Sequence, residues 1–347
     1  MSDNLNIVET NTYGRPSERG NLLGIEPYVL TSDYASLSAI TAKLDGYLAK
    51  AKSLGWLNER TIVVWPEYIG TWLSVLDETP ADSLEGVVQV IAAKYPKQFN
   101  AFLASATEQS KPFAAVFRTK AASMAAAYQT LFSGLSKKYR VTTVAGSIVL
   151  PSPQIILGKI AFDVNGLLYN TSAVFDPRGR IFPELTCKAY PTSGELPYTA
   201  PAPAGALPFY DTPAGRLGVL ICADSWYPAV YARMKEAKVK LLAVPSFGHG
   251  GLKAWTATWQ GYDGWPNAAN VDPKDVKKIT NSDAWLKYSL ATRIEESSAR
   301  FGINVFLHGS LWPDLEAGGG VAVVVRRDKM WSREVPNPGA TLNNLWL

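Results

Sequence analysis

The sequence predicts an α/β protein in which helices cover mixed β-sheets. Three observations indicate this class. Short apolar runs typical of buried strands recur along the chain, segments with helical periodicity lie between them, and turn dipeptides separate neighbouring runs in the middle of the sequence. Strands that alternate with helices in this way are typical of layered architectures, because the apolar face of a helix must be buried against a sheet.

The first half of the chain begins with a predicted strand from Leu22 to Val29 and a helix from about Tyr34 to Leu54, in which aliphatic residues recur on one face. The run TIVVW, from Thr61 to Trp65, is β-branched and fits a buried parallel strand that ends directly on Pro66 and Glu67. From Ala81 to Tyr139 the chain is rich in Ala, Lys, Gln and Leu, so we expect helices there.

The middle of the chain predicts antiparallel strands. A strand from Val141 to Leu150 precedes two runs, Lys159 to Asp163 and Leu167 to Phe175, which flank the dipeptide Asn165-Gly166. This dipeptide is favoured in tight turns, and it predicts a hairpin between the two runs.

The last third returns to alternating elements. A hairpin that turns at Pro213-Ala214-Gly215 leads straight to Cys222. Further strands are expected at Leu241 to Val244, Ile303 to His308 and Val321 to Val325, and helices near Tyr227 to Ala237 and Ser282 to Arg300.

Composition limits the class of protein. Of 347 residues, 47% are hydrophobic and 18% are charged, which is typical of a globular chain with a sizeable core. We expect one domain over residues 21–330, an N-terminal extension over residues 1–20, and a C-terminal tail over residues 331–347 that either reaches a partner subunit or folds back. The net charge of +4 is spread along the chain, so a nucleic-acid partner is not expected.

Targeting segments and cofactor motifs are not apparent in the sequence. The first twenty residues lack the apolar core of a signal peptide, and no apolar run reaches the length of a membrane span, so we expect a soluble, cytoplasmic protein. Two cysteines and two histidines do not predict a disulfide framework or a zinc site. Without a Walker or Rossmann glycine motif, we expect no cofactor and no metal.

Cys222 is the first candidate for chemistry. It follows the apolar strand Leu217 to Ile221 and precedes a predicted helix start. Backbone N–H groups at such a position can stabilise a thiolate and a developing oxyanion, which suits a nucleophile. The alternative is a structural cysteine buried in the core.

Glu67 and Lys188 are weaker candidates when each is considered alone. Glu67 directly follows a core strand, where a carboxyl group in an apolar pocket has a raised pKa and can act as a general base; it could equally cap the next helix. Lys188, in a turn-rich stretch, could stabilise an oxyanion, although most lysines are solvated at the surface.

Considered together, these segments resemble the nitrilase superfamily of carbon-nitrogen hydrolases. The motifs of that family are a strand ending in Pro-Glu, a lysine after an antiparallel hairpin, and a cysteine followed by an acidic residue and an aromatic-Pro pair. Here they read VVWPE with Glu67, CKAYP with Lys188, and GVLICADSWYP with Cys222, Asp224 and Pro228. LLAVPSFG and the Arg-x-x-Glu segment in LATRIEESSARFGINVFLHGS extend the resemblance over most of the chain.

The resemblance implies a four-layer α-β-β-α sandwich and a homodimer or larger homo-oligomer. It also implies that Glu67 takes the proton of the Cys222 thiol, that Cys222 forms a thioester, and that Lys188 stabilises the oxyanion with the backbone N–H near Ala223. Glu195 fits a second glutamate that orients the lysine and the substrate.

Glu184 is the rival for that second glutamate, and a solvated loop acid is the alternative for Glu195.

Substrate choice is less evident from the sequence. Ala223 and Asp224 after the cysteine resemble amidase or carbamoylase members, so a linear amide or an N-carbamoyl compound is the first expectation and a nitrile the second. We expect Tyr68, Ala223, Asp224 and Trp226 to contact the substrate. The tryptophan-rich segment 249–285 either lines the pocket or packs at an interface.

Three alternatives to this catalytic mechanism remain open. A papain-like pair would require His249 or His308 to reach Cys222. A catalytically silent binding protein or a redox-sensing thiol protein on the same fold would need no base.

Overall fold

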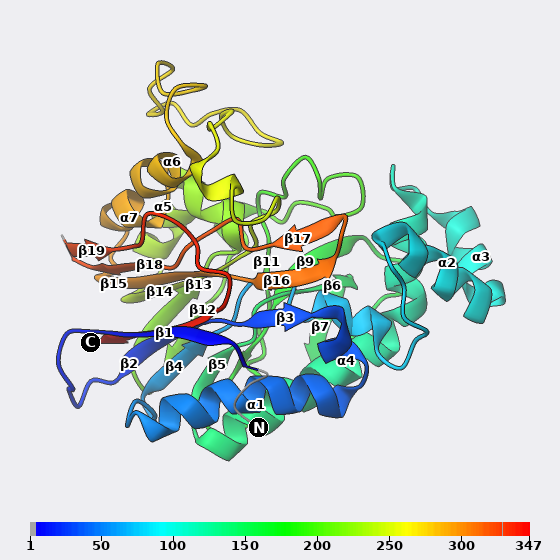
Figure 1. Ribbon diagram of the computed structural model, residues 1–347, viewed down its shortest axis with the longest axis horizontal. Coiled ribbons are helices and arrows are strands. Elements are labelled where there is room, and N and C mark those ends of the chain that lie inside the picture. The colour runs from blue at the N-terminus through cyan, green and yellow to red at the C-terminus, as the bar shows by residue number, and fades with distance from the viewer. Residues whose placement is uncertain (1–4, 328) are drawn as a thin grey trace.

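The computed structural model of the protein describes residues 5–327 and 329–347, and two six-stranded sheets lie face to face at its centre (Figure 1). Aliphatic side chains from both sheets, such as Leu22, Ile62, Leu217 and Ile303, form one fully buried cluster between them. Burial of these side chains holds the two sheets together, because apolar surface removed from water on both faces stabilises the contact.

The first sheet has the strand order β1 (Ile7–Tyr13), β20 (Ala340–Trp346), β2 (Asn21–Glu26), β4 (Thr61–Val64), β5 (Thr142–Val144) and β10 (Val174–Phe175). The central strands β2, β4 and β5 are parallel, and every residue in them is buried. Their nearly continuous apolar sequences follow from burial on both faces.

The second sheet has the order β12 (Phe209–Thr212), β13 (Gly215–Val219), β14 (Leu241–Ser246), β15 (Phe301–Phe306), β18 (Val323–Arg326) and β19 (Lys329–Trp331). Strands β13, β14 and β15 are parallel. Their carboxyl ends therefore meet at one edge, where side chains that follow the strands can converge.

Helices cover the outer face of each sheet. Helices α1 (Leu37–Ser53) and α4 (Lys111–Tyr139) pack on the first sheet, and α5 (Pro228–Glu236) and α7 (Leu290–Arg293) pack on the second, next to α6 (Asn281–Tyr288). The result is four layers, α-β-β-α, with α1 and α4 below the sheets and α5 and α7 above them in Figure 1. The predicted fold class is confirmed.

Two further helices, α2 (Leu84–Lys94) and α3 (Pro96–Ser105), project from one end of the sandwich and pack against α4 (Figure 1). Smaller sheets complete the fold: β6 (Ile148–Pro151), β9 (Leu168–Ser172) and β11 (Thr186–Cys187); β3 (Tyr28–Leu30), β16 (His308–Trp312) and β17 (Leu315–Ala317); and the hairpin β7 (Pro153–Ile156) and β8 (Lys159–Phe162). Within the described ranges, no helix is long and apolar enough to cross a membrane.

Two predicted strands are each divided in the structure. The strand predicted from Leu22 to Val29 is interrupted at Pro27, which has no N–H to donate to a ladder, and becomes β2 and β3 in different sheets. The strand predicted from Val141 to Leu150 is interrupted at Gly146, whose φ is +65° and where a Cβ would collide with the carbonyl oxygen of Pro66. Only glycine tolerates that approach, so the chain leaves the first sheet there.

The hairpin predicted at Asn165-Gly166 is wrong. Strand β8 pairs with β7 across Leu157 and Gly158, and β9 pairs with β6 and β11 instead of β8. Asn165-Gly166 does form a turn, closed by a hydrogen bond from the Gly166 N–H to the Asp163 carbonyl oxygen. The dipeptide therefore predicts the turn, but it does not predict which strands pair.

The two chain ends form part of the central sheet. Strand β20, in the segment expected as a tail, lies between β1 and β2, and is parallel to β1 and antiparallel to β2. The tail therefore folds back onto its own subunit, and residues 7–13 of the expected extension form an edge strand of the same sheet. Sequence boundaries at residues 20 and 330 do not coincide with a structural boundary, because strands distant in sequence pair side by side.

Candidate active site

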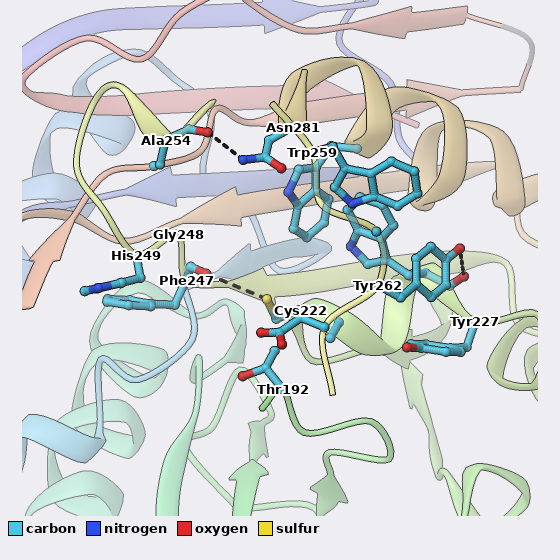
Figure 2. Close-up of a pocket in the computed structure, with 16 residues that line it drawn as sticks. Thr192, Cys222, Tyr227, Phe247, Gly248, His249, Ala254, Trp259, Tyr262 and Asn281 are labelled. Atoms are coloured by element: carbon cyan, nitrogen blue, oxygen red, sulfur yellow. Dashed lines mark hydrogen bonds between the residues drawn. The ribbon is translucent and has the colours of Figure 1, made fainter. Parts of the chain in front are cut away.

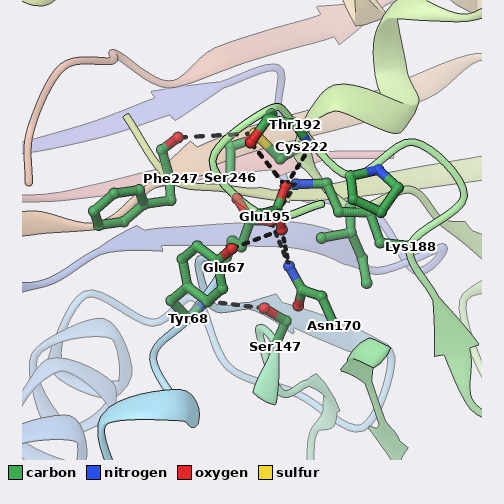
Figure 3. Close-up of polar contacts among 12 residues, drawn as sticks. Glu67, Tyr68, Ser147, Asn170, Lys188, Thr192, Glu195, Cys222, Ser246 and Phe247 are labelled. Carbon is green, nitrogen blue, oxygen red and sulfur yellow. Dashed lines mark hydrogen bonds and ion pairs between the residues drawn. The ribbon is translucent and has the colours of Figure 1, made fainter. Parts of the chain in front are cut away.

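The four side chains expected to be catalytic converge in one place, where segments that follow strands of three different sheets meet (Figure 3). Glu67 follows β4, Lys188 follows β11, and Cys222 begins a 3-10 helix (Cys222–Trp226) after β13. Glu195 lies in the loop after Lys188. All four are buried, with exposed fractions of 1% for Glu67 and Lys188, 4% for Glu195 and 6% for Cys222.

Lys188 joins the two glutamates. Its Nζ lies 2.7 Å from Glu67 Oε1 and 2.5 Å from Glu195 Oε2. The Asn170 side chain, from β9, donates to Glu67 Oε1 and to Glu195 Oε1, each at 2.8 Å. We call Glu67, Asn170, Lys188 and Glu195 the carboxylate-lysine network. Because a lysine ammonium has three donors, one N–H of Lys188 remains beyond those used by the two carboxylates.

Neighbouring groups support Glu195. Tyr68 donates its hydroxyl to Glu195 Oε1 at 2.6 Å, and Thr192 donates both its backbone N–H at 2.8 Å and its hydroxyl at 3.1 Å to Glu195 Oε2. Glu195 therefore accepts hydrogen bonds at both carboxylate oxygens. This geometry places Glu195, and not Glu184, beside the lysine; the Glu184 carbonyl oxygen lies instead near the Tyr210 hydroxyl.

The two glutamates of the network have opposite pKa shifts. Burial raises the pKa of Glu67 to about 7, although Lys188 opposes the rise. Burial acts in the same direction on Glu195, but there the charge of Lys188 and the hydrogen bonds from Lys188 and Tyr68 prevail, so the pKa of Glu195 is lowered. Glu195 is thus the permanent counter-ion of the lysine, while Glu67 can exchange a proton near neutral pH.

The lysine and the cysteine are also perturbed. Burial alone would lower the pKa of Lys188, but Glu195 and Glu67 raise it well above its usual value and keep the ammonium charged. Burial, together with the charge of Glu67, raises the pKa of the Cys222 thiol. The thiol is therefore protonated at rest and needs a base in order to react.

Cys222 has a strained backbone. Its φ is +50°, in the left-handed region that non-glycine residues rarely adopt, and its thiol points toward the Phe247 carbonyl oxygen at 3.8 Å. The Ser225 hydroxyl stabilises this backbone conformation by donating to the Cys222 carbonyl oxygen at 2.7 Å. Strain of this kind persists only where the surroundings hold the residue in place, and it directs the thiol out of the strand toward the site.

Asp224, expected to contact substrate, has a different position. It is fully buried, and its carboxylate accepts the backbone N–H groups of Ala189 at 2.9 Å, Tyr190 at 2.8 Å and Ile221 at 3.0 Å. Asp224 therefore joins the segment that bears Cys222 to the segment that bears Lys188. It does not line either cavity described below.

A first cavity of about 280 Å³ opens at Cys222 (Figure 2). Ala223 and Trp226, both expected to contact substrate, line it. The rest of its wall comes largely from the tryptophan-rich segment, through Trp259, Tyr262 and nearby residues. That segment thus lines the pocket, one of the two roles expected for it.

A second cavity of about 540 Å³ adjoins the first. Tyr68 and Glu195 line its inner end. The two cavities share four lining residues, Thr192, Phe247, His249 and Asp263. The expected contact residue Tyr68 therefore faces the second cavity and not the first.

Neither histidine forms the pair that a papain-like site requires. The ring nitrogens of His308 lie 2.8 Å from the Gly339 carbonyl oxygen and 3.2 Å from that of Gly320, in a buried position. His249 lies at the rim of the cavities with its ring turned away from Cys222 (Figure 2). In the part of the chain that the structure describes, no hydrogen bond links Cys222 to an imidazole.

Sequence reasoning missed Asn170 and Thr192. Asn170 lies in the strand LYNTS, where a fully buried amide among strand residues is a signal for a polar partner. Thr192 gave no comparable signal, because its role depends on the loop that returns Glu195 to the lysine.

A four-layer sandwich with this site is typical of hydrolases that use a cysteine. The family model for carbon-nitrogen hydrolases matches residues 27–271, so the chain belongs to the carbon-nitrogen hydrolase family. This confirms the family that the sequence motifs indicated. No curated protein matches the chain in sequence.

Solved structures share the fold at low identity. An amidase of the nitrilase superfamily from Nesterenkonia sp. AN1 has a TM-score of 0.56 and 13% identity over 96% of this chain and 93% of that one. Nit3 of Saccharomyces cerevisiae, a member of branch 10 of the nitrilase superfamily, has a TM-score of 0.52 and 14% identity over 94% of this chain and 91% of that one.

Proposed function

We propose that the protein hydrolyses a linear amide or an N-carbamoyl compound through a thioester on Cys222. The proposal rests mainly on one observation: a buried thiol, a buried glutamate and a buried lysine converge in one site, with Lys188 Nζ 2.7 Å from Glu67 Oε1 (Figure 3). Burial also raises the pKa of Glu67 to about 7. A carboxyl group with such a pKa can accept a thiol proton and return it within one catalytic cycle near neutral pH.

In the first half-reaction, Glu67 takes the thiol proton as Cys222 Sγ forms a bond to the carbonyl carbon. The negative charge on the carbonyl oxygen is stabilised by the remaining N–H of Lys188 and by the backbone N–H of Ala223. The carbon-nitrogen bond then breaks, and Glu67 gives its proton to the departing nitrogen, which leaves as ammonia or an amine.

In the second half-reaction, water attacks the thioester carbon. Glu67 takes a proton from the water, the carbon-sulfur bond breaks, and the proton returns to the Cys222 sulfur as the acid is released. Glu195 and Asn170 act as positioning residues, because they hold Lys188 and Glu67 in place through hydrogen bonds at 2.5 to 2.8 Å.

One structure with the same fold carries an amide compound at its cysteine, which is consistent with the proposed substrate class. In a mutant of the Nesterenkonia amidase, the acetamide moiety of fluoroacetamide is covalently added at the active-site cysteine. That protein has 13% identity to this chain and a TM-score of 0.53. Ala223 and Asp224 after the cysteine are also the residues that suggested an amidase or carbamoylase.

Fluoroacetamide tests the thiol, and ammonia release tests the reaction. Displacement of fluoride by Cys222 Sγ forms a thioether and leaves the amide bond intact, so the adduct reports the nucleophile alone. Intact-protein mass spectrometry after brief incubation should show one acetamide adduct on wild type, mapped by peptide analysis to Cys222, and none on Cys222→Ala. A screen of primary amides, N-carbamoyl compounds and nitriles, with ammonia release as the readout, then ranks the substrate classes. Turnover of nitriles alone would replace the amide proposal with a nitrilase.

The same measurements separate the non-enzymatic alternatives. A redox-sensing thiol would gain oxygen with peroxide and would release no ammonia from any amide, even if fluoroacetamide alkylates it. A silent binding protein would give neither an adduct nor ammonia.

A further inference from the structure

The second cavity is built from residues outside the central strands. Its wall includes Leu84 and Val87 from α2 and Phe113, Val116 and Phe117 from α4. Helix α2 projects beyond the sandwich and packs on α4 (Figure 1). These aliphatic and aromatic side chains leave an apolar surface next to the proposed reaction centre.

The acidic groups on this wall already have partners or lie at its rim. Glu195 is paired with Lys188, and Asp314 accepts the backbone N–H of Leu84 at 3.1 Å at the start of α2. Asp263, shared with the first cavity, is exposed. The interior of the second cavity is therefore suited to a group that gains by leaving water and needs no charged partner.

The two cavities differ in the chemistry that each can serve. Ammonia must leave in the first half-reaction and water must enter in the second, and both steps require hydrogen-bonding groups near the thioester. The first cavity, which Cys222 lines, offers such a group in Asn281, and Thr192 lies where the two cavities meet. The acyl group, in contrast, must stay in place from attack to release, and the apolar second cavity can hold it throughout.

From this arrangement we propose that the substrate is a primary amide whose acyl group has an apolar chain or ring, and that this group binds in the second cavity. The inference rests on the proposed function and adds its substrate class. Because the cavity of about 540 Å³ is larger than the one at Cys222, the acyl group accounts for most of the substrate's volume.

A series of primary amides from acetamide to hexanamide tests the substrate class. Burial of each added methylene should raise kcat/KM about fourfold until the chain fills the cavity. Hexanamide and its isomer N-butylacetamide then locate the apolar group, since one has it on the acyl side and the other on nitrogen. We expect hexanamide to react at least about tenfold faster.

Two variants test the cavity itself. Val116→Phe fills it and should lower the ratio of kcat/KM for hexanamide to that for acetamide about tenfold. Phe113→Ala removes part of the wall at a half-buried position, where folding is less at risk, and should lower the same ratio about threefold. The matched control is Ala122→Phe on the exposed face of α4, which should leave the ratio unchanged. Thermal melts verify that each variant is folded.

The outcomes are distinguishable. If acetamide is hydrolysed but the series is flat, or if N-butylacetamide is preferred, the inference is overturned and the proposed function stands. If folded Val116→Phe and Phe113→Ala keep the wild-type ratio, the second cavity does not bind the acyl group. If no amide reacts and fluoroacetamide leaves no adduct, the proposed function itself fails and the inference with it.

Discussion

The carboxylate-lysine network and the walls of the two cavities differ in how their residues are held. The network combines a residue that follows the central strand β4, residues in or just after the small-sheet strands β9 and β11, and Glu195 in the next loop, and each charged group in it has a partner within 2.8 Å. The cavity walls come from the projecting helix α2, from α4 and from the tryptophan-rich segment. The difference teaches that strands and the loops after them position the charged groups, while the elements added around the sandwich form the cavity walls.

If the network performs the chemistry together with Cys222, removal of this nucleophile should have the largest effect. Cys222→Ala should lower amide hydrolysis at least about 10⁴-fold, because no other group can form the thioester. Ammonia release at saturating substrate measures the loss. Cys187→Ala is the matched control, since Cys187 contacts Thr171 and not the network, and it should remain active. Equal rates for Cys222→Ala and wild type would remove the nucleophile assignment.

Replacement of the base should have the next largest effect. Glu67→Gln keeps the shape of the side chain but cannot accept a proton, so kcat should fall about 10²- to 10⁴-fold. Single-turnover kinetics with the preferred amide measures the acylation step. A Glu67→Gln enzyme with the wild-type acylation rate would assign the base to another group.

The pH dependence of wild type follows from the same group. The raised pKa of Glu67, about 7, means that the base is ionised above that pH and protonated below it. The rate should therefore rise with pH through about 7 and then level off. We call this rise the acid limb of the pH-rate profile, and the Glu67→Gln variant should lack it. A wild-type profile that is flat from pH 5 to 8 would contradict this assignment.

Removal of a positioning residue should have a smaller and more specific effect. Asn170→Ala deletes two hydrogen bonds to carboxylates, each of which favours the ionised form. The pKa of Glu67 should rise, so the acid limb should move about one pH unit higher while kcat falls about tenfold. Asn21→Ala, which loses a buried hydrogen bond to the Trp56 carbonyl oxygen far from the network, should destabilise the fold and leave the limb in place.

A wall variant should have the smallest effect. Trp259→Phe shortens an aromatic side chain in the first cavity, so KM should rise about threefold by loss of apolar contact, with the acid limb unmoved. Initial rates across pH measure both quantities. A shift of the acid limb in Trp259→Phe would show that the cavity wall and the carboxylate-lysine network are coupled. The two regions would then not act independently.

The sequence located the network because its residues follow recognisable strands. Glu67 and Cys222 come directly after apolar runs and Lys188 stands in a turn-rich stretch, but their strands β4, β13 and β11 belong to three different sheets, so only the packing of the layers brings the residues together. Asp224 shows the limit of such reasoning. Its position beside Cys222 suggests a substrate contact, but its carboxylate instead accepts hydrogen bonds from three backbone N–H groups.

Pairing between distant segments could not be predicted. No local pattern predicts the register of β20, which lies between β1 and β2 although more than three hundred residues separate it from them. It also suggested a hairpin at Asn165-Gly166, where β8 and β9 pair with other strands. Turn residues determine local direction, whereas partner choice depends on which apolar faces meet.

By itself, the sequence determined the alternation of strands and helices, the family and the residue types available for chemistry, because these depend on local pattern and on order along the chain. Only the tertiary structure decided that Asn170 joins both glutamates, that Glu195 rather than Glu184 faces Lys188, and that two cavities with different walls meet beside Cys222. These features depend on distances between segments far apart in sequence, and such distances are set when the layers pack.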